Sequence, residues 1–191
     1  VYGNSKKFPV KENFKLSAEN FYGLTKEFNE RNAQIYSNFF GIKSIGLRFF
    51  TVYGSYGRPD MFIQKIINKI KNNKLIDIYN KGKHHRDFTY VDDIKNIIYK
   101  LTTNFRKYNK VGIYNICSGK VVNIMSVVKK IEKITNKKAN LKYISLQKGD
   151  MLKTHGDNKL LRKKLKLKEF TNINKGLTMT LNSKNFWLRI F

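Results

Sequence analysis

The sequence has a single cysteine, Cys117, and only 13 acidic residues against 39 lysines and arginines. One cysteine excludes a disulfide framework and a cysteine-built zinc site, and a reduced, cytoplasmic setting is expected. Cys117 itself is predicted to be a small buried apolar side chain. No apolar run approaches the roughly 18 residues of a membrane span, and no signal-peptide pattern is visible, so no membrane partner is expected.

The excess of positive charge, formally +26, does not by itself indicate a nucleic-acid partner. Lysine outnumbers arginine by 32 to 7, whereas phosphate and base recognition favour the guanidinium fork. Lysine, asparagine and isoleucine together make up 74 of the 191 residues, and all three are encoded by AT-rich codons. We therefore attribute the charge to nucleotide composition and expect no nucleic acid. A lysine-rich module that binds polyanions, with steep salt dependence, stays open as an alternative.

The apolar content of 41% is enough for a buried core, and its periodicity alternates between helices and strands. Strands are predicted at 45–50, 76–79, 88–91, 113–116 and 141–146, with a Gly- and Tyr-rich loop at 52–60 and a turn at 80–83. Helices are predicted at 18–40, 62–70, from the pair Asp92-Asp93 onward, at 124–134, and over most of the tail after Asn158. This order predicts an α/β fold with a largely parallel sheet.

A glycine-rich dinucleotide loop is missing, because no G-x-G-x-x-G pattern occurs in the 191 residues. The first residue is Val1 rather than methionine. A parallel-sheet enzyme without its first βαβ unit would have this appearance, so we expect an N-terminally truncated chain.

The sharpest local signal is Tyr22-Gly23-Leu24-Thr25-Lys26, a Y-x-x-x-K pattern on a predicted helix. Residues four apart lie on one helical face, so the phenol and the ammonium can converge on one site. A nearby ammonium stabilises phenolate, which makes a tyrosine usable as a general base. In a chain with 11 tyrosines the pattern alone also fits a half-buried tyrosine beside a solvated lysine.

Further segments follow in an order and spacing that make the pattern more specific. They are Val1-Tyr2-Gly3, Leu47-Arg48-Phe49-Phe50-Thr51-Val52-Tyr53-Gly54, Gly57-Arg58-Pro59-Asp60-Met61, Arg86-Asp87-Phe88-Thr89-Tyr90-Val91-Asp92-Asp93-Ile94, Tyr114-Asn115-Ile116 and Gln147-Lys148-Gly149-Asp150. Over roughly residues 1–157 the chain resembles the extended short-chain dehydrogenase/reductase family of nucleotide-sugar epimerases and dehydratases. Within that family it is most similar to UDP-glucuronate 4-epimerases.

The resemblance implies roles for the residues that would face the cofactor, NAD. Tyr22 would be the catalytic acid/base, and Lys26 would hold the nicotinamide ribose and tune the phenol. Phe49 and Phe50 would lie beside the nicotinamide. The glycine-rich loop and a Ser/Thr that completes the catalytic triad would lie upstream of Val1 in the family pattern.

The resemblance also implies a UDP-sugar site. Thr51 would face the sugar, Arg58 the hexuronate carboxylate, Arg86 the diphosphate, and Tyr79 would flank the nucleotide. Without the resemblance, Arg58 could be a loop cation and Arg86-Asp87 an exposed ion pair.

The activity implied is NAD-dependent epimerisation at C4 of UDP-glucuronate to UDP-galacturonate by a homodimer. A 4,6-dehydratase and a fragment without activity of its own are the alternatives. Residues 1–52 and 90–118 are predicted to be the C-terminal part of a Rossmann-type domain, and 53–89 and 119–191 a small α/β substrate domain. Residues 178–191 depart from the family's aromatic final helix.

Two adjacent acidic or histidine pairs invite other interpretations. Asp92-Asp93 could be paired catalytic carboxylates, but helix capping explains them better. His84-His85 has no third ligand in its pattern, so we predict a solvated turn and no metal site.

Overall fold

The computed structural model describes residues 1–107, 112–146 and 150–183 and has the predicted α/β composition. Its helices are α1 (Phe21–Phe40), α2 (Phe62–Lys71), α3 (Val91–Thr103), α4 (Ile124–Thr135), α5 (Lys159–Leu165) and α6 (Ile173–Asn182), with 3₁₀ turns η1 (Asn80–Gly82) and η2 (Phe105–Lys107). Its strands are β1 (Ile45–Phe49), β2 (Thr51–Tyr53), β3 (Ile76–Tyr79), β4 (His85–Tyr90), β5 (Gly112–Ile116), β6 (Val121–Asn123) and β7 (Leu141–Ile144).

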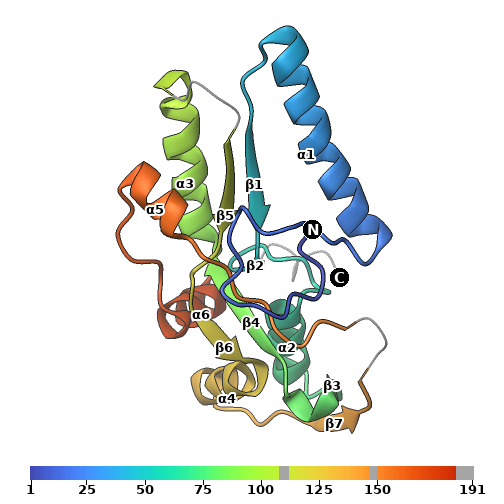
Figure 1. The fold of residues 1–191 in the computed structure, drawn as a ribbon. Helices are drawn as coiled ribbons and strands as arrows, with labels where there is room; N and C mark the ends of the chain where they lie inside the picture. Colours follow the sequence, from blue (N-terminus) through green and yellow to red (C-terminus); the bar gives the residue numbers. More distant parts are fainter. Residues whose placement is uncertain (108–111, 147–149, 184–191) are drawn as a thin grey trace.

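Parallel pairing dominates the sheets. Strand β1 pairs with β5, β2 with β4, and β3 with β7, all in parallel, while β6 joins β4 antiparallel. In Figure 1 the β1–β5 pair occupies the upper half of the molecule, and β2, β4 and β6 continue below it. Only Phe50 separates β1 from β2, so the chain passes directly from one sheet into the next.

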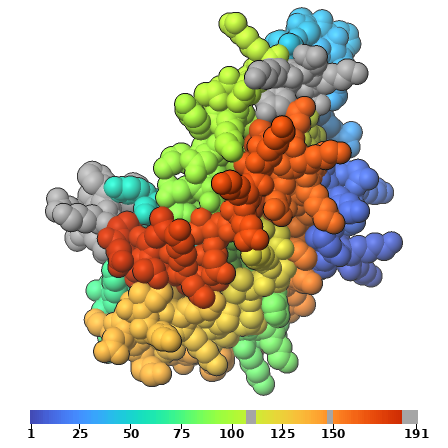
Figure 2. Space-filling model, turned by 90° about the vertical axis from the view of Figure 1, so that its left-hand side faces the viewer, coloured from blue at the N-terminus to red at the C-terminus, as the bar shows by residue number. Residues whose placement is uncertain are grey.

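Two apolar clusters hold these layers together. The larger one packs α2, α4 and α6 against β2, β3 and β4, and its isoleucines from α2 are 63, 66, 67 and 70. The smaller one packs α3 and α5 against β1 and β5. Figure 2 shows α5 and α6, orange to red, running across the face formed by α3 and α4. The division into two domains proposed from the sequence stays a prediction.

Helix α1 contributes little to either cluster. Figure 1 shows it beside β1 at the edge of the molecule, and Gly23 is the one buried residue among its twenty, all of which the structure describes. Its large apolar side chains face outward, with Phe21 88% and Phe39 79% exposed. A helix with so little buried surface needs another restraint to fix its orientation.

Several predicted boundaries were wrong. Helix α1 begins at Phe21 rather than residue 18, because Asn20 caps it by accepting a hydrogen bond from the Gly23 amide. The predicted loop at 52–60 overlaps β2, and β6 was not predicted at all; both strands have three residues, too few to show a period. Strand β4 begins earlier than predicted, at residue 85, and β7 ends earlier, at residue 144. The tail holds two separate helices, and residues 184–191 lie outside the described part.

The aspartate pair at the start of α3 does not cap it. The cap position is Tyr90, and no side chain bonds there. Asp92 pairs with Lys95, and Asp93 accepts hydrogen bonds from the backbone and hydroxyl of Thr171. Asp93 therefore joins α3 to the segment before α6. Among the described residues, no helix combines the length and the apolarity of a membrane span.

Candidate active site

A cavity of about 290 Å³ opens where β2 ends, and it is the natural starting point for the site. The chain leaves β2 through Gly54, whose φ of 146° suits glycine, and a Cβ there would lie 2.4 Å from Val91. This close approach brings the loop at 54–61 against the start of α3. The cavity is lined among others by Thr51, Tyr53, Arg58, Gln64, Phe88 and Val91. Two predicted substrate residues, Thr51 and Arg58, therefore share one cavity.

Tyr22 and Lys26 meet on the first turns of α1, as their spacing predicts. The ammonium of Lys26 lies 5.2 Å from the centroid of the Tyr22 ring, which is cation–π geometry. Both side chains are exposed, Tyr22 to 72%. The pair is thus open to a ligand, and the half-buried tyrosine of the alternative interpretation is not what the structure contains.

The loop at 54–61 carries an ion pair between Arg58 and Asp60. Arg58 donates from Nε and Nη2 to the two carboxylate oxygens of Asp60, and both residues are exposed. These hydrogen bonds raise the pKa of Arg58 and lower that of Asp60.

Arg86 belongs to a separate cluster at the other end of β4. Its Nη2 lies 3.7 Å from Asp150 Oδ1, and His84 Nε2 lies 3.1 Å from Asp150 Oδ2. Burial lowers the pKa of Arg86, and Asp150 acts against that shift. His84 is buried, so the predicted solvated turn was wrong for this residue. Its partner is remote in sequence.

Asp87 points away from Arg86, so the sequence alternative of an Arg86–Asp87 ion pair was wrong. Its carboxylate is fully buried and accepts from the backbone and hydroxyl of Ser118 and from the amides of Gly119 and Gly156. Burial raises the pKa of Asp87 despite these donors. This carboxylate joins β4 to the loop after β5 and to the segment before α5.

The remaining predicted residues are more scattered. Phe49 ends β1 with its side chain about half exposed, and Tyr79 ends β3. Neither Tyr79 nor Arg86 lines the cavity beside Thr51. Gln147 to Gly149 of the Q-x-G-D pattern lie outside the described residues, and Asp150 is described.

Sequence analysis missed one polar residue of the cavity, Gln64, and one buried polar residue outside it, Arg48. Gln64 lines the cavity while being 96% buried, and its Oε1 has no hydrogen-bond partner among the described residues. Its place within an isoleucine-rich helical period, on the face turned inward, was the signal that could have found it. Arg48 was quoted only as part of a motif. Cys117 is buried as predicted, and within the described part of the chain no three metal-ligating side chains gather.

Comparisons with known proteins identify the relatives of this arrangement. The sequence model of the NAD dependent epimerase/dehydratase family matches residues 1–117. An uncharacterized protein of Methanocaldococcus jannaschii is 39% identical over 195 residues, which cover all of this chain and 59% of the relative. A probable UDP-glucuronate 4-epimerase of Rhizobium meliloti is 29% identical, over 93% of this chain and 57% of the relative. The chain thus spans somewhat less than three fifths of these relatives.

The similar solved structures likewise include a UDP-glucuronic acid 4-epimerase. MoeE5 in complex with UDP-glucuronic acid and NAD superposes with a TM-score of 0.89 and 28% identity, over 99% of this chain and 62% of that one. A UDP-glucuronic acid 4-epimerase from Bacillus cereus, also with UDP-glucuronic acid and NAD, has a TM-score of 0.88 and 28% identity, over 95% and 57%. The predicted Rossmann-type α/β fold is confirmed.

Proposed function

Because the chain belongs to the NAD dependent epimerase/dehydratase family, we propose that it supplies the acid/base and the sugar site of an enzyme that epimerises UDP-sugars at C4. The substrate we propose is UDP-glucuronate, with UDP-galacturonate as the product. The observation that carries the proposal is the exposed Tyr22–Lys26 pair, in a chain whose cavity is lined by Thr51 and Arg58.

Tyr22 would move the proton of the sugar 4-hydroxyl. Its phenolate accepts that proton as C4 is oxidised to a ketone, and its phenol returns a proton after the ketone is reduced from the other face. The Lys26 ammonium lies beside the ring, 5.2 Å from its centroid. A residue in this role has to reach substrate, and the 72% exposure of Tyr22 supports it.

The residues present fit the nicotinamide end of NAD. An exposed phenol and ammonium on α1, and an exposed aromatic ring at the carboxyl end of β1, are groups that can bind a ribose and a flat ring. Tyr22, Lys26 and Phe49 would hold it. NAD, when bound, supplies the reversible oxidation at C4.

The sugar would lie in the cavity, with Thr51 and Arg58 as its polar contacts. A guanidinium fork suits a planar carboxylate, so Arg58 would recognise C6 of a hexuronate. Arg86 would bind the diphosphate, and Tyr79 would flank the nucleotide. A diphosphate would have to compete for Arg86 with Asp150, whose Oδ1 lies 3.7 Å from the guanidinium.

The exposed apolar side chains of α1 support a homodimer in which this helix meets its copy. Phe28, Phe39 and Phe40 are each at least 60% exposed. Monomeric proteins rarely leave so many large apolar side chains of one helix in water. Sedimentation of the double variant Phe28→Lys/Phe39→Lys tests this. We expect a monomer where the parent is a dimer; an unchanged sedimentation coefficient would contradict the proposal.

The activity is tested in a chimera that joins this chain to the part of the Methanocaldococcus jannaschii relative that the alignment leaves out. The chimera is incubated with UDP-glucuronate and NAD, and the products are separated by chromatography. We expect UDP-galacturonate at equilibrium with the substrate. With UDP-glucose in place of UDP-glucuronate, a 4-keto-6-deoxy product would indicate a dehydratase instead, because C6 then carries the hydroxyl that is eliminated as water. No turnover of either sugar would contradict both.

A further inference from the structure

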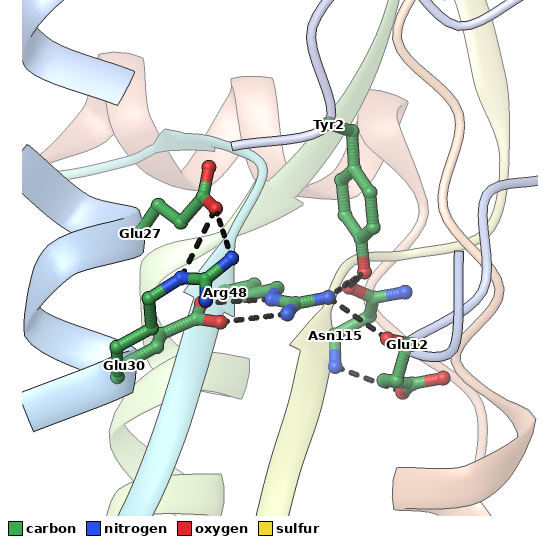
Figure 3. Close-up of polar contacts among 7 residues, drawn as sticks. Tyr2, Glu12, Glu27, Glu30, Arg48 and Asn115 are labelled. Atoms are coloured by element: carbon green, nitrogen blue, oxygen red, sulfur yellow. Dashed lines mark hydrogen bonds and ion pairs between the residues drawn. The ribbon is translucent and has the colours of Figure 1, made fainter. Parts of the chain in front are cut away.

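A buried arginine joins the outlying helix α1 to the sheet. Arg48, in β1, donates from Nε and Nη2 to the two oxygens of Glu30, at 2.8 and 2.7 Å. Its Nη1 donates to the Tyr2 hydroxyl at 2.7 Å and to the Glu12 carbonyl at 3.1 Å. Figure 3 shows the guanidinium between these partners. Its side chain is 8% exposed and Glu30's is 16%, so the fork is held almost entirely by protein.

The network continues into β5. The Tyr2 hydroxyl donates to Asn115 Oδ1 at 2.6 Å, and the backbone N–H of Asn115 donates to Glu12 Oε1 at 2.9 Å. Asn115 is fully buried and lies beside Arg48 in the parallel register of β1 and β5. Arg48 is therefore fixed by the sheet and by the N-terminal segment before it reaches α1.

Glu30 lies on the same face of α1 as the proposed acid/base pair. It follows Lys26 by four residues and Tyr22 by eight, which is about 12 Å along the helix axis. Because α1 buries only Gly23, apolar packing does not define its rotation. Two parallel hydrogen bonds to one carboxylate do fix a direction as well as a distance.

We propose, resting on the function proposed above, that Glu30 is a positioning residue for catalysis. Through its two hydrogen bonds to Arg48 it sets the rotation and height of α1. That in turn places the Tyr22 phenol against a sugar held at the loop at 54–61. Glu30 does not touch substrate and takes no part in proton transfer.

Glu27 provides a matched control on the same helix. It lies one turn before Glu30, and its carboxylate pairs with Arg31 at 2.9 Å, whose side chain is 74% exposed. The variant Glu27→Gln removes the same charge from α1 without touching Arg48. A difference between Glu30→Gln and Glu27→Gln therefore measures the bridge to the sheet and not the helix charge.

The first measurement is independent of activity. Amide hydrogen exchange on the 191-residue chain compares α1 with α2, which lies in the larger apolar cluster. We expect Glu30→Gln to speed exchange in α1 at least tenfold, with α2 unchanged, and Glu27→Gln to change neither. Equal exchange of α1 in the two variants overturns the proposal, whatever the enzyme catalyses.

The second measurement compares the turnover of the chimera and its variants per UDP-sugar binding site. Turnover is divided by the number of UDP-sugar sites found by calorimetry, so that loss of folded protein is not mistaken for slow chemistry. We expect Glu30→Gln to lower kcat on the order of 100-fold with KM within twofold, as for a small misplacement of a reacting group. The solvent deuterium isotope effect on kcat should rise, because proton transfer becomes rate-limiting. Glu27→Gln should stay within twofold of the parent.

A double variant covers the case in which Glu30→Gln does not fold. Glu30→Leu/Arg48→Met removes both charges, and apolar replacement of a buried pair usually preserves folding. We expect this variant to bind UDP-sugar and to turn over about as slowly as Glu30→Gln. Turnover at the parent rate overturns the positioning role. If the parent chimera itself shows no epimerisation, the proposed function fails, and the exchange result still decides whether the bridge orients α1.

Discussion

Arg58 donates two hydrogen bonds to Asp60, Nε to Oδ1 at 3.0 Å and Nη2 to Oδ2 at 2.5 Å, with only Pro59 between them in the chain. The guanidinium proposed to bind the hexuronate is therefore paired with an internal carboxylate. A substrate carboxylate at this position has to compete with Asp60 for the same donors. Two variants therefore test the substrate assignment: loss of Arg58 should impair the use of UDP-glucuronate, and loss of the Asp60 charge should strengthen its binding.

Loss of Arg58 should discriminate between substrates. In the chimera, Arg58→Ala should lower kcat/KM for UDP-glucuronate about tenfold or more, because the guanidinium that pairs with the substrate carboxylate is lost. UDP-glucose has no carboxylate, so its kcat/KM should stay within about twofold. The reverse variant Asp60→Asn should tighten binding of UDP-glucuronate, as measured by calorimetry. Equal losses for both sugars in Arg58→Ala would make Arg58 a structural residue and leave the UDP-sugar unspecified.

Asp87 should give the stability of the chain an unusual dependence on pH. Burial raises its pKa above the ordinary 3.8, so its contribution to stability is complete below that value. The contribution is lost as the pH rises through the raised pKa, because the charged form must be buried. In Asp87→Asn this loss disappears. In urea unfolding, the free energy of unfolding of the variant relative to that of the parent should therefore rise as the pH increases above 3.8.

The same variant should cost about 1–3 kcal/mol at neutral pH, because an amide cannot accept from all the donors that Asp87 now satisfies. Parallel stability curves for Asp87→Asn and the parent would show that this carboxylate does not titrate with folding. Ser118→Ala, the matched comparison, removes one donor whose hydrogen bond lowers the pKa of Asp87. It keeps the carboxylate and should extend the loss of stability to higher pH than in the parent.

Gly176 should not tolerate a side chain. A Cβ at this position of α6 would lie 2.0 Å from the hydroxyl oxygen of Tyr53. That oxygen is buried and has no hydrogen-bond partner in the described part of the chain. Gly176→Ala should therefore destabilise the chain by about 1–3 kcal/mol in denaturant unfolding. The double variant Gly176→Ala/Tyr53→Phe should recover only part of this loss, because Cζ and Cε2 of the ring would still lie 2.8 and 3.0 Å from the added Cβ. No recovery would mean that the ring, rather than the hydroxyl, sets the limit.

Sequence reasoning predicted the elements with a clear apolar period. The isoleucines of α2, and Ile124 and Ile131 of α4, are buried where a 3.6-residue repeat places them. The spacing of Tyr22 and Lys26 brought these two side chains together. Strands β2 and β6 were not predicted, because three residues are too few to show an alternation of apolar and polar side chains. Their positions depend on pairing with β4.

The residues that sequence reasoning misjudged have partners far along the chain. His84 looked like a solvated turn, yet Asp150 lies against it. Arg48 looked like part of a strand motif, and its fork is completed by Glu30 in the preceding helix. Local sequence cannot indicate which distant carboxylate covers a cation, because that choice is made by packing.

The central claim is that Tyr22 is the acid/base of a UDP-sugar epimerase, and Tyr22→Phe tests it most directly. The variant removes only the phenolic oxygen, so calorimetry on the chimera should show UDP-glucuronate binding within about twofold of the parent. Epimerisation should fall by two to four orders of magnitude, roughly the contribution of general acid–base catalysis. Tyr36→Phe, on the same helix and about half exposed, should change neither. If Tyr22→Phe epimerises UDP-glucuronate within a few-fold of the parent, Tyr22 is not the acid/base and the account fails.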